Sequence, residues 1–378
     1  MKNPKLIYIT NVRMPTEKAH GIQMIKMCEA FANGGLDVLF VVPKRKNRIK
    51  ENTFSYYGVK KIFEIKYVWT LDLINILPWV GYWLETLIFI KLVAFKYLFS
   101  SRRDKVIYTR DFLIAFIFNM LGFKVVYEAH RIILKKKIFF RLLKGVKHIV
   151  TNSKGTAEEF IKTGFKKVSP LPNGVDLKEF DIKKSKKELR EKLGLPQNKK
   201  IIMYTGNLFD WKGVETLLDV SGMLDPDKHL TVIVGGQDKD IEGKKKYVKN
   251  KNIKGVMFFG HQNRKIIPQF LKSADCLVLP NSPISEESIK YTSPVKLAEY
   301  MASGVPIVLS DLPSLRAILG PTEGLFVPPD DAEALKIGIE KVLDDSALAS
   351  NLAESALKGV LKYTWDIRAN KILDFIRG

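Results

Sequence analysis

The stretch Tyr291–Pro306 carries the signals of a loop that leads directly into a short helix. Ser293 is a favourable N-cap, because its hydroxyl can accept a hydrogen bond from the first free amides, and Pro294 suits the first helical position. Gly304 should then close the helix, and the apolar run Ile307–Leu309 predicts a short buried strand. A helix N-terminus approached by small residues offers unpaired N–H groups and a positive dipole end to an anion.

Two charged side chains lie three residues apart on this predicted helix. Lys296 and Glu299 should therefore share one of its faces. A cation and a carboxylate beside an anion-binding helix terminus would suit a ligand that carries both phosphate and hydroxyl groups. The same pattern is typical of an ordinary capped surface helix with an ion pair, and the stretch alone favours neither interpretation.

A histidine follows another predicted strand. His130 comes soon after the apolar run Val125–Tyr127, with Glu128 close by. A histidine at the end of a strand can polarise a hydroxyl, which makes His130 a candidate catalytic group. A purely structural histidine is equally compatible with the pattern.

The sequence gives little support to a metal or a nicotinamide site. Cys28 and Cys276 are far apart and have no neighbouring histidine cluster, which argues against a structural zinc and for a reducing compartment. Asp225–Asp227 and Asp238–Asp240 match a loose two-carboxylate pattern, but turns are the more usual setting for both. No Gly-x-Gly-x-x-Gly follows the first predicted strand. We therefore expect no metal and no cofactor.

Apolar strands alternate with helical patterns along most of the chain, which is the signature of parallel α/β sheets. Turn residues at Leu171–Asp176 and then a charged run interrupt the pattern, which restarts at Lys200. We expect one domain over residues 1–170 and a second over 171–364, with ligands at the carboxyl ends of the strands, in a cleft between the domains. The predicted strands are Leu6–Ile9, Asp37–Val42, Val106–Tyr108, Val125–Tyr127, His148–Val150, Lys200–Tyr204, Leu230–Val234, Val256–Phe259, Cys276–Pro280 and Ile307–Leu309.

The charge is distributed unevenly along the 378 residues, whose formal net charge is +22. Residues 1–200 contain 40 Lys and Arg against 17 Asp and Glu, whereas the remaining residues contain 22 against 23. The whole positive excess therefore lies in the first half, which suggests an anionic partner: nucleic acid, an anionic membrane or an anionic acceptor. No recognition motif accompanies the charge, so we do not expect nucleic acid.

Two segments of the first half are candidates for a membrane interface. Residues 73–100 form the most apolar region, but their longest uncharged run, Leu73–Leu84, is too short to span a bilayer. A core helix and a helix lying in the membrane interface, with Trp79 near one end, both remain open. Residues 135–147 mix Lys and Arg with apolar side chains, as a basic amphipathic helix or a plain solvated face does.

Taken together, these features resemble a GT-B-fold glycosyltransferase of the retaining glycosyltransferase family 4 (glycosyl transferases group 1). The resemblance covers nearly the whole chain and implies two Rossmann-like parallel-sheet domains facing across a cleft. The first would bind the acceptor, the second the nucleotide-sugar donor, and a last helix, about residues 365–378, would cross back to the first. The matching motifs are Ala19–Gln23, Tyr127–Arg131, Thr151–Ser153, Leu171–Asp176, Gly206–Gly213, Phe259–Gly260 with Ala274–Asp275, and above all Ser293–Pro306.

The resemblance also implies roles for single residues. Lys212 and the helix after Ser293 would hold the donor diphosphate, and Glu299 would bond the ribose hydroxyls. His130 would lie near the transferred sugar, which Gly21 would allow the first loop to approach. Lys212, Glu299 and His130 are thus the candidate catalytic residues. The candidate donor-binding residues are Gly21, Gly206, Asn207, Lys212, Gly260, His261, Tyr291, Thr292, Ser293, Pro294, Val295, Lys296 and Glu299.

The sequence departs from the family pattern at two positions. The first glutamate of the family's paired-glutamate motif would fall at position 291, where this chain has Tyr291, so the identity of the sugar is open. The arginine that commonly precedes the lysine by five residues would fall at Asn207, which keeps hydrogen bonding but lacks the charge. Some members with a similar Thr-Ser-Pro-x-Lys motif also lack the first glutamate, so we interpret the chain as a variant and not as an inactive enzyme.

The resemblance implies a retaining, metal-independent hexosyltransferase that uses a nucleoside-diphosphate sugar. Its acceptor would be membrane-associated or anionic: a lipid-linked glycan, a lipopolysaccharide or a glycolipid. The basic first half would then contact an anionic membrane peripherally, at the cytoplasmic face. The alternatives are a catalytically idle nucleotide-sugar-binding module and a sugar-nucleotide epimerase on the same fold.

Overall fold

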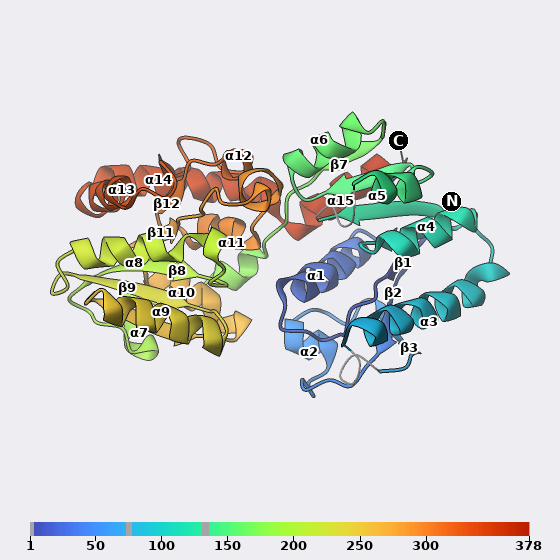
Figure 1. The fold of residues 1–378 in the computed structure, drawn as a ribbon, viewed down its shortest axis with the longest axis horizontal. Coiled ribbons are helices and arrows are strands. Elements are labelled where there is room, and N and C mark those ends of the chain that lie inside the picture. Colours follow the sequence, from blue (N-terminus) through green and yellow to red (C-terminus); the bar gives the residue numbers. More distant parts are fainter. Residues whose placement is uncertain (1–3, 73–77, 131–135, 378) are drawn as a thin grey trace. The chain divides into compact units, whose positions relative to one another are not determined.

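The computed structural model describes residues 4–72, 78–130 and 136–377. The chain divides into an N-terminal unit, Met1–Pro172 with Trp365–Gly378, and a C-terminal unit, Asn173–Thr364. Each unit is built on its own parallel sheet, flanked by helices (Figure 1). The fold class predicted from the sequence, two Rossmann-like α/β domains, is therefore confirmed.

The sheet of the N-terminal unit is doubly wound. Its described strands are β1 (Lys5–Ile9), β2 (Val38–Lys44), β3 (Glu64–Trp69), β4 (Lys105–Thr109), β5 (Lys124–Ala129), β6 (His148–Thr151) and β7 (Val168–Pro170). They lie in the order β3-β2-β1-β4-β5-β6-β7, and all pairs are parallel. The chain order reverses between β1 and β4, and sheets of this kind bind ligands at the carboxyl ends of the strands beside such a reversal.

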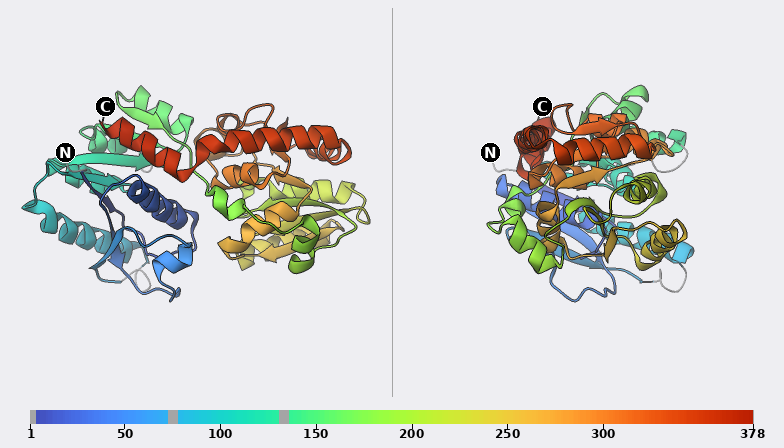
Figure 2. Two further views of the ribbon diagram at one scale, coloured as in Figure 1. Left: turned by 180° about the vertical axis from the view of Figure 1, so that it is seen from behind. Right: turned by 90° about the vertical axis from the view of Figure 1, so that its left-hand side faces the viewer.

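Helices cover both faces of this sheet. They are α1 (Ala19–Asn33), α2 (Thr53–Tyr57), α3 (Pro78–Leu98), α4 (Phe112–Met120), α5 (Lys136–Leu143), α6 (Lys154–Lys162) and α15 (Trp365–Arg377). Alternate side chains of a strand point to opposite faces, so Tyr108 of β4 packs with α1 and α15, whereas Ile107 packs with α3, α4 and α5. Helices α1, α2 and α15 thus share one face, and α3 to α6 share the other (Figures 1 and 2).

The C-terminal unit repeats the plan. Its described strands, β8 (Lys200–Thr205), β9 (His229–Val234), β10 (Val256–Gly260), β11 (Cys276–Leu279), β12 (Ile307–Ser310) and β13 (Leu325–Val327), lie in the order β10-β9-β8-β11-β12-β13. All pairs are parallel, and the chain order reverses between β8 and β11. The helices are α7 (Lys186–Leu193), α8 (Val214–Met223), α9 (Asp238–Asn250), α10 (Ile267–Ser273), α11 (Val295–Ser303), α12 (Pro313–Arg316), α13 (Ala332–Asp344) and α14 (Ser346–Val360).

All ten predicted strands are present, each within two residues of its predicted ends. The sequence did not indicate β3, β7 or β13. The edge strand β3 pairs only with β2 within the described residues and places Glu64 and Lys66 among its apolar side chains, while β7 and β13 are only three residues long. The turn predicted at Asp238–Asp240 is wrong. These residues form the first turn of α9, where carboxylates stabilise the positive end of the helix. Asp225–Asp227 does lie in a turn.

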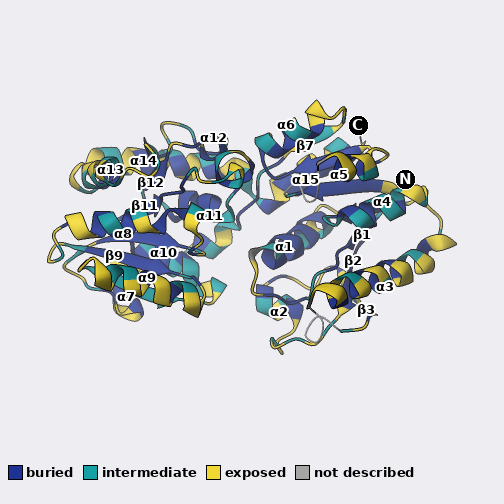
Figure 3. Ribbon diagram, in the orientation of Figure 1, coloured by how far each residue is buried: buried dark blue, intermediate teal, exposed yellow. Residues whose placement is uncertain are grey.

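The apolar segment at residues 73–100 combines features of both of its interpretations. Residues 73–77 lie outside the described chain, and α3 follows from Pro78. One face of α3 packs on the sheet through Phe89 and Val93, while other apolar side chains of the helix are exposed. Figure 3 shows that both buried and exposed residues occur along α3. The predicted basic helix is α5, whose first expected residue, Lys135, also lies outside the described chain. Among the described residues, no helix combines the length and the apolarity needed to cross a bilayer.

Candidate active site

Lys212 occupies the loop that follows β8, at the carboxyl end of the C-terminal sheet. It ends a short 3-10 turn, Asp210–Lys212, and only 7% of the residue is exposed. Its Nζ lies 3.5 Å from the centroid of the Trp211 ring, and within the described residues no carboxylate lies within ion-pair distance of it. Burial lowers the pKa of Lys212 to about 7, partly opposed by Glu287. Lys212 is thus a buried amine that is only partly charged near pH 7 and has no carboxylate at ion-pair distance among the described residues.

The backbone after Lys212 is fixed by a glycine. Gly213 adopts the left-handed conformation, φ 63, and both ends the 3-10 turn and caps α8. A Cβ atom at this position would overlap the carbonyl oxygen of Pro280, which follows β11. Only glycine combines this conformation with this close approach, so the turn that carries Lys212 is held against the neighbouring strand.

A second lysine lies close to the same loop. Lys296 of α11 donates a hydrogen bond from Nζ to the Tyr204 hydroxyl at 2.8 Å, and the Tyr204 hydroxyl donates to the Asn207 carbonyl at 2.6 Å. A Cβ atom on Gly206, whose φ is 131, would overlap the Lys296 side chain, so glycine is required there. Burial, and then repulsion from Lys212, holds the pKa of Lys296 well below its usual value. We call Lys212 and Lys296 the lysine pair.

The ion pair that the sequence left open between Lys296 and Glu299 is not formed. The Glu299 Oε1 instead lies 2.7 Å from Nη2 of Arg264, in the loop after β10, while Lys296 turns to Tyr204. Arg264 is a site residue that the sequence reasoning missed, since the carboxylate on α11 and the guanidinium after β10 are brought together only by the fold. Glu299 is buried and held in one orientation by this pair.

The start of α11 differs from the prediction. Ser293 is not the N-cap: Pro294 occupies that position in an extended conformation (φ -67, ψ 123), so the Ser293 hydroxyl lies one residue too early to reach the free amides. The Ser293 Oγ is buried without a hydrogen-bond partner among the described residues, and both amide atoms of Asn281, after β11, are in the same state. Leaving a buried polar group unpaired costs about 1–3 kcal/mol, so these atoms favour a polar ligand at this edge of the sheet.

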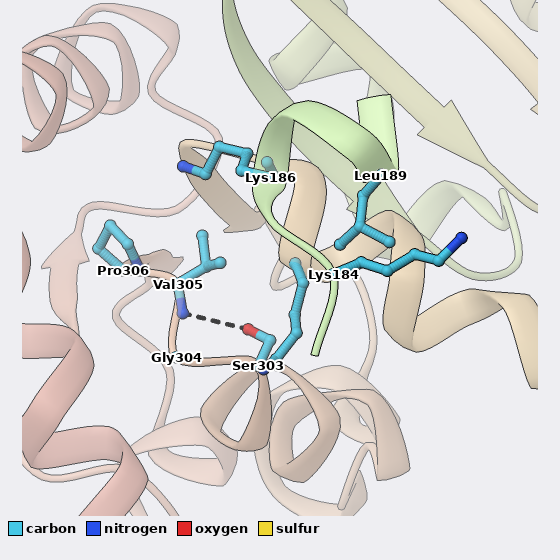
Figure 4. A pocket seen from close by; sticks show the side chains of 9 residues that line it. Lys184, Lys186, Leu189, Ser303, Gly304, Val305 and Pro306 are labelled. Atoms are coloured by element: carbon cyan, nitrogen blue, oxygen red, sulfur yellow. Dashed lines mark hydrogen bonds between the residues drawn. The ribbon is translucent and has the colours of Figure 1, made fainter. Parts of the chain in front are cut away.

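The other predicted donor-binding residues lie on the loops around this edge. Gly260 ends β10 with φ 63 and accepts a hydrogen bond from the Gly235 amide at 2.6 Å. Asn207, after β8, and His261, after β10, are exposed, whereas Tyr291 and Thr292 are buried before α11. A separate pocket of about 230 Å³ lies at the opposite end of α11, beside Gly304 and Pro306, and is therefore not part of this site (Figure 4).

A second group of candidate residues surrounds Glu128 in the N-terminal unit. The fully buried Glu128 carboxylate accepts hydrogen bonds from the Tyr108 hydroxyl at 2.8 Å, Gln23 Nε2 at 3.0 Å and Arg368 Nη2 at 2.7 Å. His130 Nε2 lies 2.9 Å from the same carboxylate. Burial alone would raise the pKa of Glu128, but Arg368 and then His130 outweigh it and hold the pKa well below its usual value. We call these residues the Glu128 cluster.

The Glu128 cluster holds the His130 ring in place and keeps it neutral. His130 Nε2 lies 2.9 Å both from the Glu128 carboxylate, which accepts, and from Gln23 Nε2, which donates, so these contacts orient the ring and are compatible with either tautomer. Burial, and then the positive charge of Arg110, lowers the pKa of His130 to about 4, so the ring is neutral near pH 7. Arg110 also donates to Gln23 Oε1 at 2.6 Å. A neutral, oriented imidazole can accept a hydrogen bond from a hydroxyl group.

Three members of this cluster, and the neighbouring Arg110, were not predicted as site residues. Gln23 belongs to the Ala19–Gln23 motif but had no assigned role, Tyr108 lies on β4, and Arg368 comes from α15. Arg368 is 240 positions away from Glu128, and no local pattern could have linked the two. Gly21, predicted to let the loop approach the sugar, has a packing role: a Cβ there would overlap the Tyr57 hydroxyl. Its role toward a ligand stays a prediction.

Comparisons with known proteins agree with this geometry. The family model described as Glycosyltransferase Family 4 matches residues 21–179, and the model described as Glycosyl transferases group 1 matches residues 185–359. In a crystal structure of Anabaena Alr3699/HepE in complex with UDP and glucose, the protein is 14% identical to this chain. The alignment covers 100% of both chains with a TM-score of 0.77, and this likeness establishes the fold.

Curated relatives match part of the chain. An uncharacterized glycosyltransferase, MJ1607, of Methanocaldococcus jannaschii is 30% identical over 58% of this chain and 56% of its own length. The phosphatidyl-myo-inositol mannosyltransferase of Mycobacterium leprae is 27% identical over 54% of this chain and 51% of its own length. The chain therefore spans about half the length of these curated relatives.

Proposed function

Because the chain belongs to the GT-B-fold glycosyltransferases, with a family 4 domain followed by a group 1 domain, we propose that it transfers a hexose-type sugar from a nucleoside-diphosphate sugar. The observation that carries this proposal is the lysine pair. Burial and repulsion from Lys212 oppose the charging of Lys296, burial opposes the charging of Lys212, and neither has a carboxylate within ion-pair distance among the described residues. A diphosphate would relieve that repulsion and supply the missing counter-charge.

We propose that the donor binds at the carboxyl end of the C-terminal sheet. Lys212 and Lys296 would face the diphosphate, and the unpaired Ser293 hydroxyl would donate to it. Glu299, oriented by Arg264, would accept hydrogen bonds from the ribose hydroxyls. As the bond to the sugar breaks, negative charge grows on the leaving diphosphate, and fixed cations stabilise that charge most. The charge of the two lysines supports transfer without a metal, and retention of the anomeric configuration is part of the proposal.

The acceptor is proposed to bind the N-terminal unit, where His130 would accept a hydrogen bond from its hydroxyl. The relative from Mycobacterium leprae is by its name a mannosyltransferase of a phospholipid, which supports a lipid-linked or other anionic acceptor here. Such an acceptor would bring the protein into peripheral contact with an anionic membrane, at the cytoplasmic face. The positive excess of the first half of the chain supports that contact.

The donor proposal is tested by thermal unfolding across a panel of nucleoside-diphosphate sugars, followed by a nucleotide-release assay. A ligand that binds the folded state raises the melting temperature, so at least one donor should do so and should be slowly hydrolysed without an acceptor. Binding without nucleotide release would indicate an idle module. Conversion of the sugar while it stays attached to the nucleotide would indicate an epimerase. A panel without any stabilising member would overturn the proposal.

A further inference from the structure

Helix α3 departs from the usual amphipathic arrangement on both of its faces: the inner face carries a buried carboxylate among apolar residues, and the outer face carries large apolar side chains beside the exposed Lys91 and Lys96. Glu85, fully buried on its inner face, lies 3.0 Å from Nε of Arg45, and the neighbouring Thr86 hydroxyl accepts from Asn11 at 2.6 Å. On the outer face, by contrast, Trp79 is 78% exposed and Phe95 is 69% exposed. A helix of a water-exposed surface normally turns its charged side chains outward.

The apolar surface continues onto the next helix. Helices α3 and α4 contact each other on the same face of the sheet, and α4, Phe112–Met120, contains no charged residue. Met120 at its end is 70% exposed. We call the exposed side chains of these two helices the apolar face; they include Trp79, Val80, Leu84, Leu87, Phe95 and Met120. Contiguous apolar patches on a protein surface mark interaction sites.

Cations border the apolar face on the side of α5, which contacts α4. Lys137 and Arg141 of α5, and Lys144 directly after it, are exposed and form no ion pair within the described part of the chain; we call these three the α5 cations. Arg141 and Lys144 also line a cavity of about 850 Å³, whose walls combine the apolar Phe140, Val146 and Phe165 with Lys147, Lys166 and Lys167. An apolar cavity with a cationic rim complements an amphiphile with an anionic headgroup.

We propose that the apolar face and the α5 cations form a docking surface for an anionic lipid bilayer. The exposed side chains of α3 and α4 enter the interfacial region, and the cations of α5 contact lipid phosphates at its margin. The cations favour an anionic bilayer over a second copy of this chain as the occupant, because a second copy would bring positive charges against each other. The purpose of this surface, the delivery of a membrane-held acceptor, rests on the proposed function. Lipid binding itself is measured without turnover and is therefore tested independently.

The test is sedimentation with phosphatidylglycerol-containing vesicles and with neutral phosphatidylcholine vesicles. The native chain should prefer the anionic vesicles, and the variant K137Q/R141Q/K144Q should bind them about 100-fold more weakly, since each cation near the surface contributes about fivefold. The matched control K245Q/K246Q/K249Q, which removes three exposed lysines of α9, should bind like the native chain. Equal losses in the two variants would overturn the proposal.

The apolar half of the surface is tested separately. L87E/F95E should abolish vesicle binding, whereas I337E, at an exposed position of α13, should leave it unchanged. Brominated lipids should quench the fluorescence of Trp79, and this quenching should be absent in W79F. Donor-induced thermal stabilisation should be equal in all variants, which shows that they fold and separates this test from the test of the proposed function. The proposal would be overturned if the native chain did not bind vesicles and instead formed a dimer that L87E/F95E dissociates. The apolar face would then belong to an interface with a second copy.

Discussion

The lysine pair and the Glu128 cluster lie at equivalent edges of two similar sheets, yet their charges are balanced differently. In the N-terminal unit, the buried Glu128 is matched by Arg368 and bonded by its neighbours, and His130 stays neutral. In the C-terminal unit, Lys212 and Lys296 repel each other, and the Ser293 hydroxyl has no partner among the described residues. One edge is electrostatically complete without a ligand, and the other is not.

This difference separates two tasks that a group-transfer enzyme must perform. A charged ligand binds most strongly where the free protein leaves a buried charge uncompensated, because binding then removes an existing cost. A proton-accepting group needs a neutral state and a fixed orientation, which a closed network provides before any ligand arrives. The comparison therefore predicts that disruption of the Glu128 cluster costs stability, whereas disruption of the lysine pair costs donor binding and turnover.

The largest effect is expected from Arg368→Met. Removing one partner of a buried ion pair leaves Glu128 uncompensated and should lower the free energy of unfolding by about 3–5 kcal/mol. Loss of the guanidinium should also raise the pKa of His130, which becomes the remaining cationic partner of Glu128. Urea unfolding measures the first effect and NMR titration of the imidazole the second. The control Lys371→Met, on the exposed side of α15, should change neither.

Lys212→Ala should act in the opposite way. The variant loses a buried charge, so its free energy of unfolding should stay equal or rise, while kcat for donor cleavage should fall about 10²–10³-fold, the usual effect of removing one fixed stabilising group. Steady-state kinetics and urea unfolding of the same preparation test both halves. Full activity in Lys212→Ala would remove the lysine pair from the mechanism; Lys245→Ala, at an exposed position of α9, serves as the control.

These expectations could be formed only partly from the sequence. The strands were predictable because continuous apolar runs bounded by turn residues have few other interpretations, as at Lys200–Tyr204. Lys212 and Glu299 could be selected because each lies in a local motif. The partners Arg264 and Arg368 could not, because Glu299–Arg264 and Glu128–Arg368 are contacts between segments that only the folded chain brings together. The sequence identifies candidate charges, and the fold decides which of them are neutralised.

Donor affinity should depend on pH through Lys212. Its pKa is about 7 in the folded protein, against about 10.4 for an unperturbed lysine, so the free protein loses this charge as the pH rises above about 7. Affinity for a nucleoside diphosphate should then fall by up to tenfold per pH unit, with proton uptake on binding at pH 8. Calorimetry in buffers of different ionisation enthalpy measures this uptake, which Lys212→Met should reduce to the part contributed by Lys296.

The same pKa shift gives a signed prediction for stability. Between about pH 7 and pH 10.4 the unfolded chain binds more protons at Lys212 than the folded chain does, so the free energy of unfolding should gain a contribution that rises with pH across this window. The contribution should be absent in Lys212→Met. A native chain and a Lys212→Met variant with identical pH profiles of stability would show that this lysine is not an uncompensated charge.

The smallest effect, and the finest test of the comparison, is expected from Ser293→Ala. If the buried hydroxyl has no partner until a donor arrives, its removal should leave the free energy of unfolding unchanged or slightly raised. Affinity for the donor should fall about fivefold, the equivalent of one hydrogen bond of about 1 kcal/mol. The matched variant Ser221→Ala removes a buried hydroxyl that already bonds Leu217 and Thr231, and should show the reverse: lower stability and unchanged affinity. A loss of stability in Ser293→Ala as large as that in Ser221→Ala would mean that the hydroxyl is satisfied in the free protein, and the two edges would no longer differ in this respect.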